Sequence, residues 1–110
     1  MKITQQKFHF IAIGGVGMSA LAKYLLERGA IVSGSDIQES KYTHLLEEKG
    51  AKIYIGHSEN NVNEDMIIVA STAIKDSNPE IKKAKALLTD QGQKGSCFLF
   101  FLKCFGINPF

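Results

Sequence analysis

Short apolar runs alternate with longer amphipathic segments along most of the chain. Each run is rich in β-branched or aromatic residues and ends at a glycine or a polar loop, a pattern typical of buried parallel strands. Strands spaced by helical segments predict βαβ units with right-handed crossovers, and therefore a parallel sheet with helices on both faces. The runs lie at residues 8–13, 30–35, 51–56 and 66–71.

Helices are predicted between and after these strands. From Met18 to Leu26 the apolar positions recur at i, i+3, i+4, i+7 and i+8, which places them on one face of a helix. Residues 40–50 and 77–87 carry the start and stop signals of two more helices. The resulting element order predicts one Rossmann-like α/β domain over residues 1–86.

The last segment, residues 87–110, differs in composition from the rest. It holds five of the seven phenylalanines and has no acidic residue after Asp90. One interpretation is a terminal strand at residues 97–102. The other is that the segment is an aberrant, out-of-frame extension that does not belong to the evolved domain.

Composition and charge narrow the classes of function. The fractions of 45% hydrophobic and 22% charged residues are typical of a soluble globular domain. A net charge of +2 with scattered basic residues argues against nucleic acid or an anionic membrane as a partner. The two cysteines, Cys97 and Cys104, form neither a disulfide framework nor a metal-ligand set. With no signal peptide and no apolar run near the roughly 20 residues of a membrane span, we expect a cytoplasmic protein.

A glycine-rich stretch stands where the first predicted strand meets the first predicted helix. Residues 15–20 fit the fingerprint G-x-G-x-x-G/A of phosphate-binding turns in dinucleotide-binding domains. Bare backbone at Gly15 and Gly17 would let main-chain N–H groups approach a phosphate at the positive end of the helix dipole. Ala20, the small third residue, is expected to let the helix lie close to the sheet. The alternative is that the glycines serve only the turn.

Other polar residues are expected at the same edge of the sheet, where open α/β folds bind ligands. Asp36 ends the second strand about 20 residues beyond the glycines, the usual place of an acid that bonds a ribose hydroxyl; the alternatives are a solvated carboxylate or a helix cap. Ser71, Thr72 and Ala73 follow the fourth strand, where hydroxyl groups would bond phosphate oxygens or only close a local turn. His57 follows the third strand and either touches the ligand or is an exposed loop histidine.

Catalytic signatures are absent from the sequence. It contains no G-x-x-x-x-G-K-[ST] loop for ATP, no nucleophile elbow, no zinc-ligand spacing and no convincing pair of carboxylates for acid–base work. His9 and His44 are interpreted as structural. The residues therefore predict a binding domain without a catalytic residue or metal site of its own. The fingerprint and Asp36 alone also permit an NAD-binding module of a dehydrogenase or regulator.

Three longer stretches resemble the N-terminal domain of the bacterial Mur ligases. They read FHFIAIGGVGMSALAKYLLERGAIVSGSD, LLEEKGAKIYIGHSENNV and VASTAIKDSNPEI, and they span roughly residues 7–86. The resemblance implies a Rossmann-like domain that binds the UDP part of UDP-N-acetylmuramate. It implies that the glycine loop contacts the diphosphate, that the acid after the second strand lies near the uridine, and that the loop after the fourth strand closes over the phosphates. The residues so implicated are Gly15, Val16, Gly17, Met18, Asp36, Ser71, Thr72 and Ala73, with His57 at a matching position of unassigned role.

The full-length members of that family carry more than these 110 residues. The resemblance implies an ATP- and Mg²⁺-dependent ligase of peptidoglycan synthesis, which joins L-alanine to the lactyl carboxylate of the sugar through an acyl phosphate. The family's ATP-binding stretch G-T-H-G-K-T and its C-terminal domain are not in this sequence, so we expect no cofactor on the chain and no catalysis by it alone. A non-functional truncated product is the remaining alternative. Ala12, where the family usually has glycine, is expected to be a mild departure.

Overall fold

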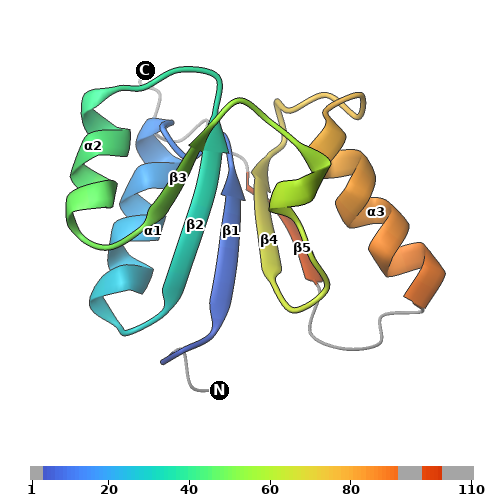
Figure 1. The fold of residues 1–110 in the computed structure, drawn as a ribbon, viewed down its shortest axis with the longest axis horizontal. Coiled ribbons are helices and arrows are strands. Elements are labelled where there is room, and N and C mark those ends of the chain that lie inside the picture. Colours follow the sequence, from blue (N-terminus) through green and yellow to red (C-terminus); the bar gives the residue numbers. More distant parts are fainter. Residues whose placement is uncertain (1–3, 92–97, 103–110) are drawn as a thin grey trace.

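Parallel strands form a single sheet in the residues that the computed structural model describes, 4–91 and 98–102. The strand order is β3-β2-β1-β4-β5, and each neighbouring pair is parallel (Figure 1). The strands are β1 (Lys7–Ile11), β2 (Ile31–Asp36), β3 (Lys52–Ile55), β4 (Ile67–Ser71) and β5 (Phe98–Leu102). The helices are α1 (Val16–Glu27), α2 (Lys41–Glu48) and α3 (Pro79–Gln91), with a 3-10 turn, η1 (Glu59–Asn61), after β3.

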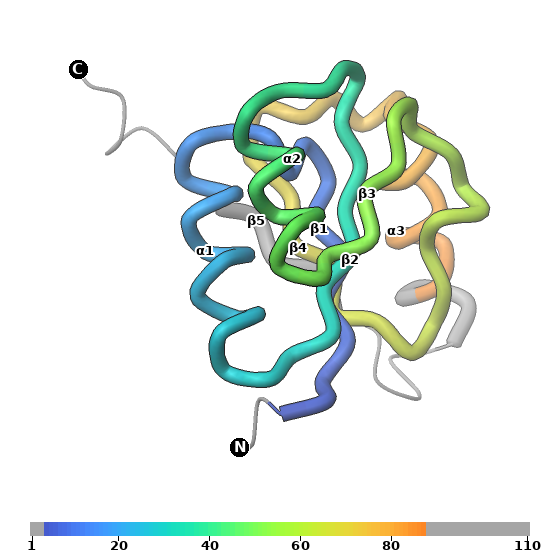
Figure 2. The backbone as a smooth tube through the Cα atoms, turned by 60° about the vertical axis from the view of Figure 1, so that its left-hand side comes forward, coloured from blue at the N-terminus to red at the C-terminus, as the bar shows by residue number. Residues whose placement is uncertain are grey.

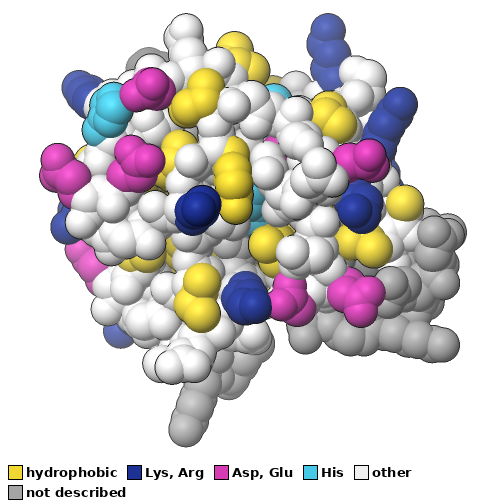
Figure 3. Space-filling model, in the orientation of Figure 1, with side chains coloured by type: hydrophobic (Ala, Val, Ile, Leu, Met, Phe, Trp, Pro, Cys, Tyr) yellow, Lys and Arg dark blue, Asp and Glu magenta, His cyan; other side chains and the backbone are white. Residues whose placement is uncertain are grey.

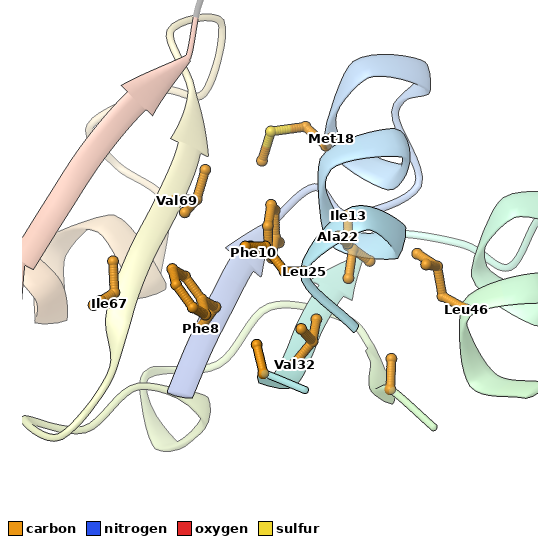
Figure 4. Close-up of a cluster of buried hydrophobic side chains, with 12 residues drawn as sticks. Phe8, Phe10, Ile13, Met18, Ala22, Leu25, Val32, Leu46, Ile67 and Val69 are labelled. Atoms are coloured by element: carbon orange, nitrogen blue, oxygen red, sulfur yellow. The ribbon is translucent and has the colours of Figure 1, made fainter. Parts of the chain in front are cut away.

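The helices α1 and α2 cover one face of the sheet, and α3 covers the other (Figure 1, Figure 2). The strands dictate this arrangement because their successive side chains point to opposite faces. On β1, Phe8 and Phe10 pack into the core under α1 and α2 (Figure 4). Ile11 packs instead into the core under α3, together with Ile81. His9 shares that second face and is fully buried.

The buried side of α1 follows the predicted helical period. Met18, Ala22 and Leu25 are buried against the sheet. Ala20 is exposed, so the expectation that it lets the helix approach the sheet is wrong. At about 100° per residue, position 20 lies roughly 200° around the helix from Met18 and faces away from the core.

The predicted fold class, a Rossmann-like parallel sheet with helices on both faces, is confirmed. The predicted helix at the C-terminal end continues to Gln91, beyond the domain boundary expected at residue 86. A strand is present at Phe98–Leu102, in agreement with one interpretation of the last segment, and it pairs with β4 along its length. Residues 92–97 and 103–110 of that segment lie outside the described residues.

The surface of the described part carries charges of both signs. On the face shown in Figure 3, acidic and basic side chains are interspersed. Lys7 and Asp65 form one exposed ion pair, with Nζ 2.8 Å from Oδ2. None of the described helices combines the length and the apolar character that crossing a membrane would require.

Candidate functional site

The turn between β1 and α1 leaves the start of the helix open. Gly15 is the N-cap residue, and its backbone is extended, with φ −65° and ψ 154°. No side chain caps this helix among the described residues. The first N–H groups of α1, from Val16 to Met18, therefore lack the partners that a helix interior would supply, and they sit at the positive end of the helix dipole. Such an end is suited to hold a phosphate.

The backbone conformation does not require glycine at positions 15 and 17. Gly15 has an ordinary negative φ, and the nearest neighbour of a Cβ built on it would be the Ala12 carbonyl oxygen, at an unstrained 3.6 Å. Gly17 lies inside α1 and has no positive φ. Glycine inside a helix costs about 0.5–1 kcal/mol relative to alanine, so its presence at position 17 favours the phosphate interpretation over the turn alone. At position 15, the N-cap of α1, glycine is an ordinary residue and does not distinguish the two interpretations.

Gly14, which lies outside the glycine fingerprint, has a different role. A Cβ there would lie 2.7 Å from Oδ2 of Asp36, so a larger residue would displace the carboxylate from its present position. The Gly14 N–H donates to Oδ2 at 2.8 Å. In the sequence, this close approach is indicated only by a second glycine directly before Gly15.

Asp36 is placed at the glycine loop, as its position in the sequence predicts. Its Oδ2 accepts from Gly14, and its Oδ1 accepts from the Ile37 N–H at 2.8 Å. The side chain is thus neither free in solvent nor the cap of α2, a role that Ser40 takes. It holds the glycine loop against the end of β2 and retains lone pairs for a ligand hydroxyl.

The turn before Ile13 is tied to the same strand. The N–H groups of Ala12 and Ile13 both donate to the Ser35 carbonyl oxygen, at 2.9 Å each. Ala12 adopts φ +73°, in the left-handed region that favours glycine. The alanine is therefore a less mild departure than expected from the glycine that the resemblance implies at this position.

The loop after β4 shows the local turn that is the alternative to phosphate binding. The Ser71 hydroxyl oxygen accepts from the Ala73 N–H at 3.1 Å, and the Ser71 carbonyl accepts from the Ile74 N–H at 3.1 Å. Thr72 and Ala73 are exposed. Because β4 is the parallel neighbour of β1, this loop leaves the sheet at the same edge as the glycine loop.

A buried carboxylate that was not predicted from the sequence is the centre of a polar cluster on the face of the sheet that α3 covers. Glu80, near the start of α3, is 0% exposed. Its Oε1 accepts from Ser35 Oγ at 2.8 Å and lies 2.7 Å from His9 Nε2. Its Oε2 accepts from the Ser58 N–H and from Asn61 Nδ2, both at 3.0 Å.

These bonds control the charge of Glu80. Burial raises the pKa of the carboxyl, but hydrogen bonds from His9 and Asn61, the positive charge of His9 and the Ser58 N–H outweigh burial and lower the pKa to about 2. The carboxylate is therefore ionised at neutral pH. The sequence signals of this polar cluster are weak, because they consist of single polar residues in apolar strands and one glutamate after a proline.

His57 belongs to the same cluster and is mostly buried. Its Nδ1 lies 2.7 Å from Ser35 Oγ and 3.6 Å from Glu80 Oε2, and its side chain is 13% exposed. The serine, histidine and glutamate are the residue types of a hydrolytic triad, but not its geometry. Ser35 is fully buried and donates its proton to Glu80, so it is no nucleophile.

A shallow apolar groove of about 210 Å³ lies beside the glycine loop, between α1 and α2. Its lining includes Val16, Ala20, Lys23, Tyr42 and Leu45. Of the predicted site residues, only Val16 reaches it. In the described part of the chain, no three histidine, cysteine or acidic side chains come together in a way that would hold a metal ion.

The parallel sheet, the open first turn of α1 and the acid at the end of β2 define a Rossmann-like domain of the class that binds phosphorylated ligands at its first βα turn. The pattern that describes the Mur ligase family, catalytic domain, matches residues 7–90. The chain belongs to the Mur ligase family.

Individual relatives agree with this assignment. Over 80 residues the chain is 59% identical to UDP-N-acetylmuramate–L-alanine ligase of Aquifex aeolicus, covering 73% of this chain and 18% of that protein. Against the Acetivibrio thermocellus enzyme of the same name it is 54% identical, covering 72% of this chain and 17% of that protein. The crystal structure of UDP-N-acetylmuramate-alanine ligase from Thermotoga maritima superposes with a TM-score of 0.69 at 33% identity, covering 84% of this chain and 20% of that one. The chain thus spans about a fifth of the length of these relatives.

Proposed function

We propose that this chain is the UDP-N-acetylmuramate-binding domain of a UDP-N-acetylmuramate–L-alanine ligase of peptidoglycan synthesis. The observation that carries the proposal is the open N-terminus of α1, where Gly15 and Gly17 are glycines that the backbone conformation does not demand. The identity to ligases of that name supports the choice of ligand.

The proposed ligand lies along the carboxyl edge of the sheet. The diphosphate accepts hydrogen bonds from the main-chain N–H groups of residues 15–18, at the positive end of α1. Asp36 and His57 flank the nucleoside, and residues 71–73 close over the phosphates. A UDP-activated sugar as substrate also leads us to propose a cytoplasmic location.

The chemical step is proposed for the whole enzyme only. There L-alanine would be joined to the lactyl carboxylate of the sugar with ATP and Mg²⁺. The sequence contains no P-loop, and the described residues hold no group of three potential metal ligands, which supports assigning ATP and Mg²⁺ to the rest of the enzyme. This chain would contribute recognition of the UDP end of the substrate.

Titration calorimetry of the 110-residue chain tests the proposal. UDP-N-acetylmuramate should bind saturably and NADH should not. Gly17→Val should raise the Kd by about 100-fold, because a branched side chain keeps the main-chain N–H groups from the phosphates.

Ala20→Val is the matched control, since it places the same side chain on an exposed position of the same helix. It should leave the Kd within about twofold of the original. Saturable binding of NADH without binding of the UDP-sugar would contradict the proposal and favour a dinucleotide-binding module. Unchanged affinity in Gly17→Val would remove the phosphate role of the glycine loop.

A further inference from the structure

The buried cluster around Glu80 fixes the position of one hydrogen atom. The carboxylate is ionised and can only accept hydrogen bonds. Ser35 Oγ lies 2.8 Å from Oε1 and has a single hydrogen, which it must donate to that oxygen. Towards His57 the serine therefore offers only lone pairs. Since Nδ1 of His57 lies 2.7 Å from the serine Oγ, Nδ1 carries the hydrogen.

The other ring nitrogen of His57 is left free to accept. When the imidazole is neutral and Nδ1 is protonated, Nε2 carries a lone pair. Nε2 of His57 has no hydrogen-bond partner among the described residues, whereas every buried side-chain nitrogen and oxygen there has one. This atom consequently faces the surface.

His57 is joined to the phosphate-binding loop through the backbone. The preceding residue, Gly56, donates its N–H to the Asp36 carbonyl oxygen at 2.7 Å. The Asp36 carboxylate in turn holds Gly14. The imidazole therefore lies at the same end of β2 as the glycine loop.

We propose that Glu80, acting through Ser35, is a positioning residue that holds His57 as its Nδ1–H tautomer, so that Nε2 accepts a hydrogen bond from a donor on the nucleoside of the ligand. The donor is either the imide N–H of the base or a ribose hydroxyl. The ligand half of this inference rests on the proposed function. The part that concerns the tautomer applies to the free protein and does not depend on the proposed function.

The tautomer is measured in the free chain by two-bond ¹H–¹⁵N correlation spectra of the histidine rings, at a pH where His57 is neutral. The spectrum should show hydrogen on Nδ1 and an unprotonated Nε2. Hydrogen on Nε2 would overturn the proposal, whatever the variants do.

Glu80→Gln should invert this tautomer. The Ser58 N–H is a backbone donor that cannot rotate, so it keeps the amide oxygen of the new side chain on its own side. The amide NH₂ then faces Ser35, which accepts from it and donates its hydrogen to Nδ1 of His57. His57 should become the Nε2–H tautomer, and retention of the Nδ1–H form in the folded variant would contradict the role of Glu80.

Ser33→Ala is the matched control. Ser33 lies on the same face of β2, two residues from Ser35, and its Oγ is 2.7 Å from His9 Nδ1 rather than from His57. Its removal perturbs the cluster without touching the path from Glu80 to His57. The His57 tautomer should stay unchanged, and inversion here would overturn the assigned path.

Binding of UDP and its analogues tests the ligand half. Glu80→Gln should raise the Kd for UDP about tenfold, because the inverted ring presents a hydrogen to a donor. With N3-methyl-UDP or 2′- or 3′-deoxy-UDP, the analogue that lacks the relevant donor should bind the original chain about tenfold more weakly than UDP. The same analogue should lose nothing further in Glu80→Gln.

The outcomes separate the two proposals. If UDP and UDP-N-acetylmuramate fail to bind the original chain, the proposed function fails, while the tautomer spectrum still decides the role of Glu80. If all UDP analogues bind the original chain as well as UDP does, the acceptor role of His57 is overturned although the proposed function stands. This comparison needs no variant and so does not depend on whether Glu80→Gln folds.

Discussion

At the scale of single residues, the turn after β1 stores conformational strain. Ala12 has φ +73°, where the Cβ of an L-residue approaches the following carbonyl oxygen at a cost of about 1–2 kcal/mol. The turn persists because Ala12 and Ile13 both donate to the Ser35 carbonyl, which anchors the loop to β2. The strain thus lies directly beside the proposed phosphate site, and the protein tolerates it there.

Ala12→Gly should therefore stabilise the protein. Glycine removes the strain but adds freedom to the unfolded chain, so the net gain in the free energy of unfolding should be about 0.5–1 kcal/mol. Urea unfolding at neutral pH measures it. The control is Ala73→Gly, an exposed loop alanine without a positive φ, which should lose stability. Equal losses in both variants would show that Ala12 is not strained.

The glycines show how far the sequence can be interpreted at this scale. The fingerprint predicts Gly15 and Gly17 because their spacing is a local pattern. The role of Gly14 has no such pattern, since it depends on Asp36 Oδ2, which only the folded chain brings within 2.7 Å of the place that a Cβ on Gly14 would take. The prediction for Ala20 is wrong because a fingerprint specifies residue size but not the rotation of the helix around its axis.

At the scale of secondary-structure elements, α3 is held to the sheet by polar contacts as well as by its apolar face. Glu80 joins the start of α3 to His9 on β1 and to Ser35 on β2. It also accepts from Ser58 and Asn61, before and within η1. A buried carboxylate with these partners stabilises the arrangement, whereas loss of its charge leaves donors unmatched.

This arrangement predicts a loss of stability in acid. The pKa of Glu80 is lowered from 4.5 to about 2 by folding, so the stabilisation is fully present above pH 4.5 and disappears as the pH falls towards 2. The difference corresponds to about 3 kcal/mol. Urea unfolding at several pH values across this range and up to neutrality measures it. Glu80→Gln lacks the titrating group and should lose less stability over that range; parallel losses in both proteins would refute the assignment.

The elements are predictable from the sequence, but the contacts between them are not. The alternation of apolar runs with amphipathic segments predicts β1 to β4, and the helical period predicts the buried side of α1. Both patterns are local properties of the sequence. The pairing of His9 with Glu80 joins positions 71 residues apart, and no local pattern marks it. The sequence accordingly indicates only a structural role for His9, leaves two roles open for His57 and marks Glu80 only weakly, as a glutamate after a proline.

At the scale of the whole molecule, the chain is a small part of the ligases to which it is similar. It spans 17–18% of the two curated relatives and 20% of the structurally aligned one. Its candidate site lies at one edge of the sheet and consists of groups suited to a nucleotide and its phosphates. The remainder of the proposed substrate would extend away from the described residues.

UDP and UDP-N-acetylmuramate should therefore bind this chain with Kd values within about tenfold of each other, because the sugar and its lactyl group add few contacts. Parallel calorimetric titrations under the same conditions measure both. UMP serves as the control and should bind more weakly than UDP, since it lacks the second phosphate. A UDP-sugar Kd lower by several orders of magnitude than that of UDP would place major sugar contacts on this chain.

The central position of β1 constrains how the chain assembles as it leaves the ribosome. β1 precedes the other described strands along the chain, yet it pairs with β2 on one side and with β4 on the other. Parallel partners require long crossovers, so these pairings are distant along the sequence and slow to form. Phe8 and Phe10 share their core with Ile67 and Val69 of β4, so their burial is completed only after the chain has been synthesised as far as residue 71.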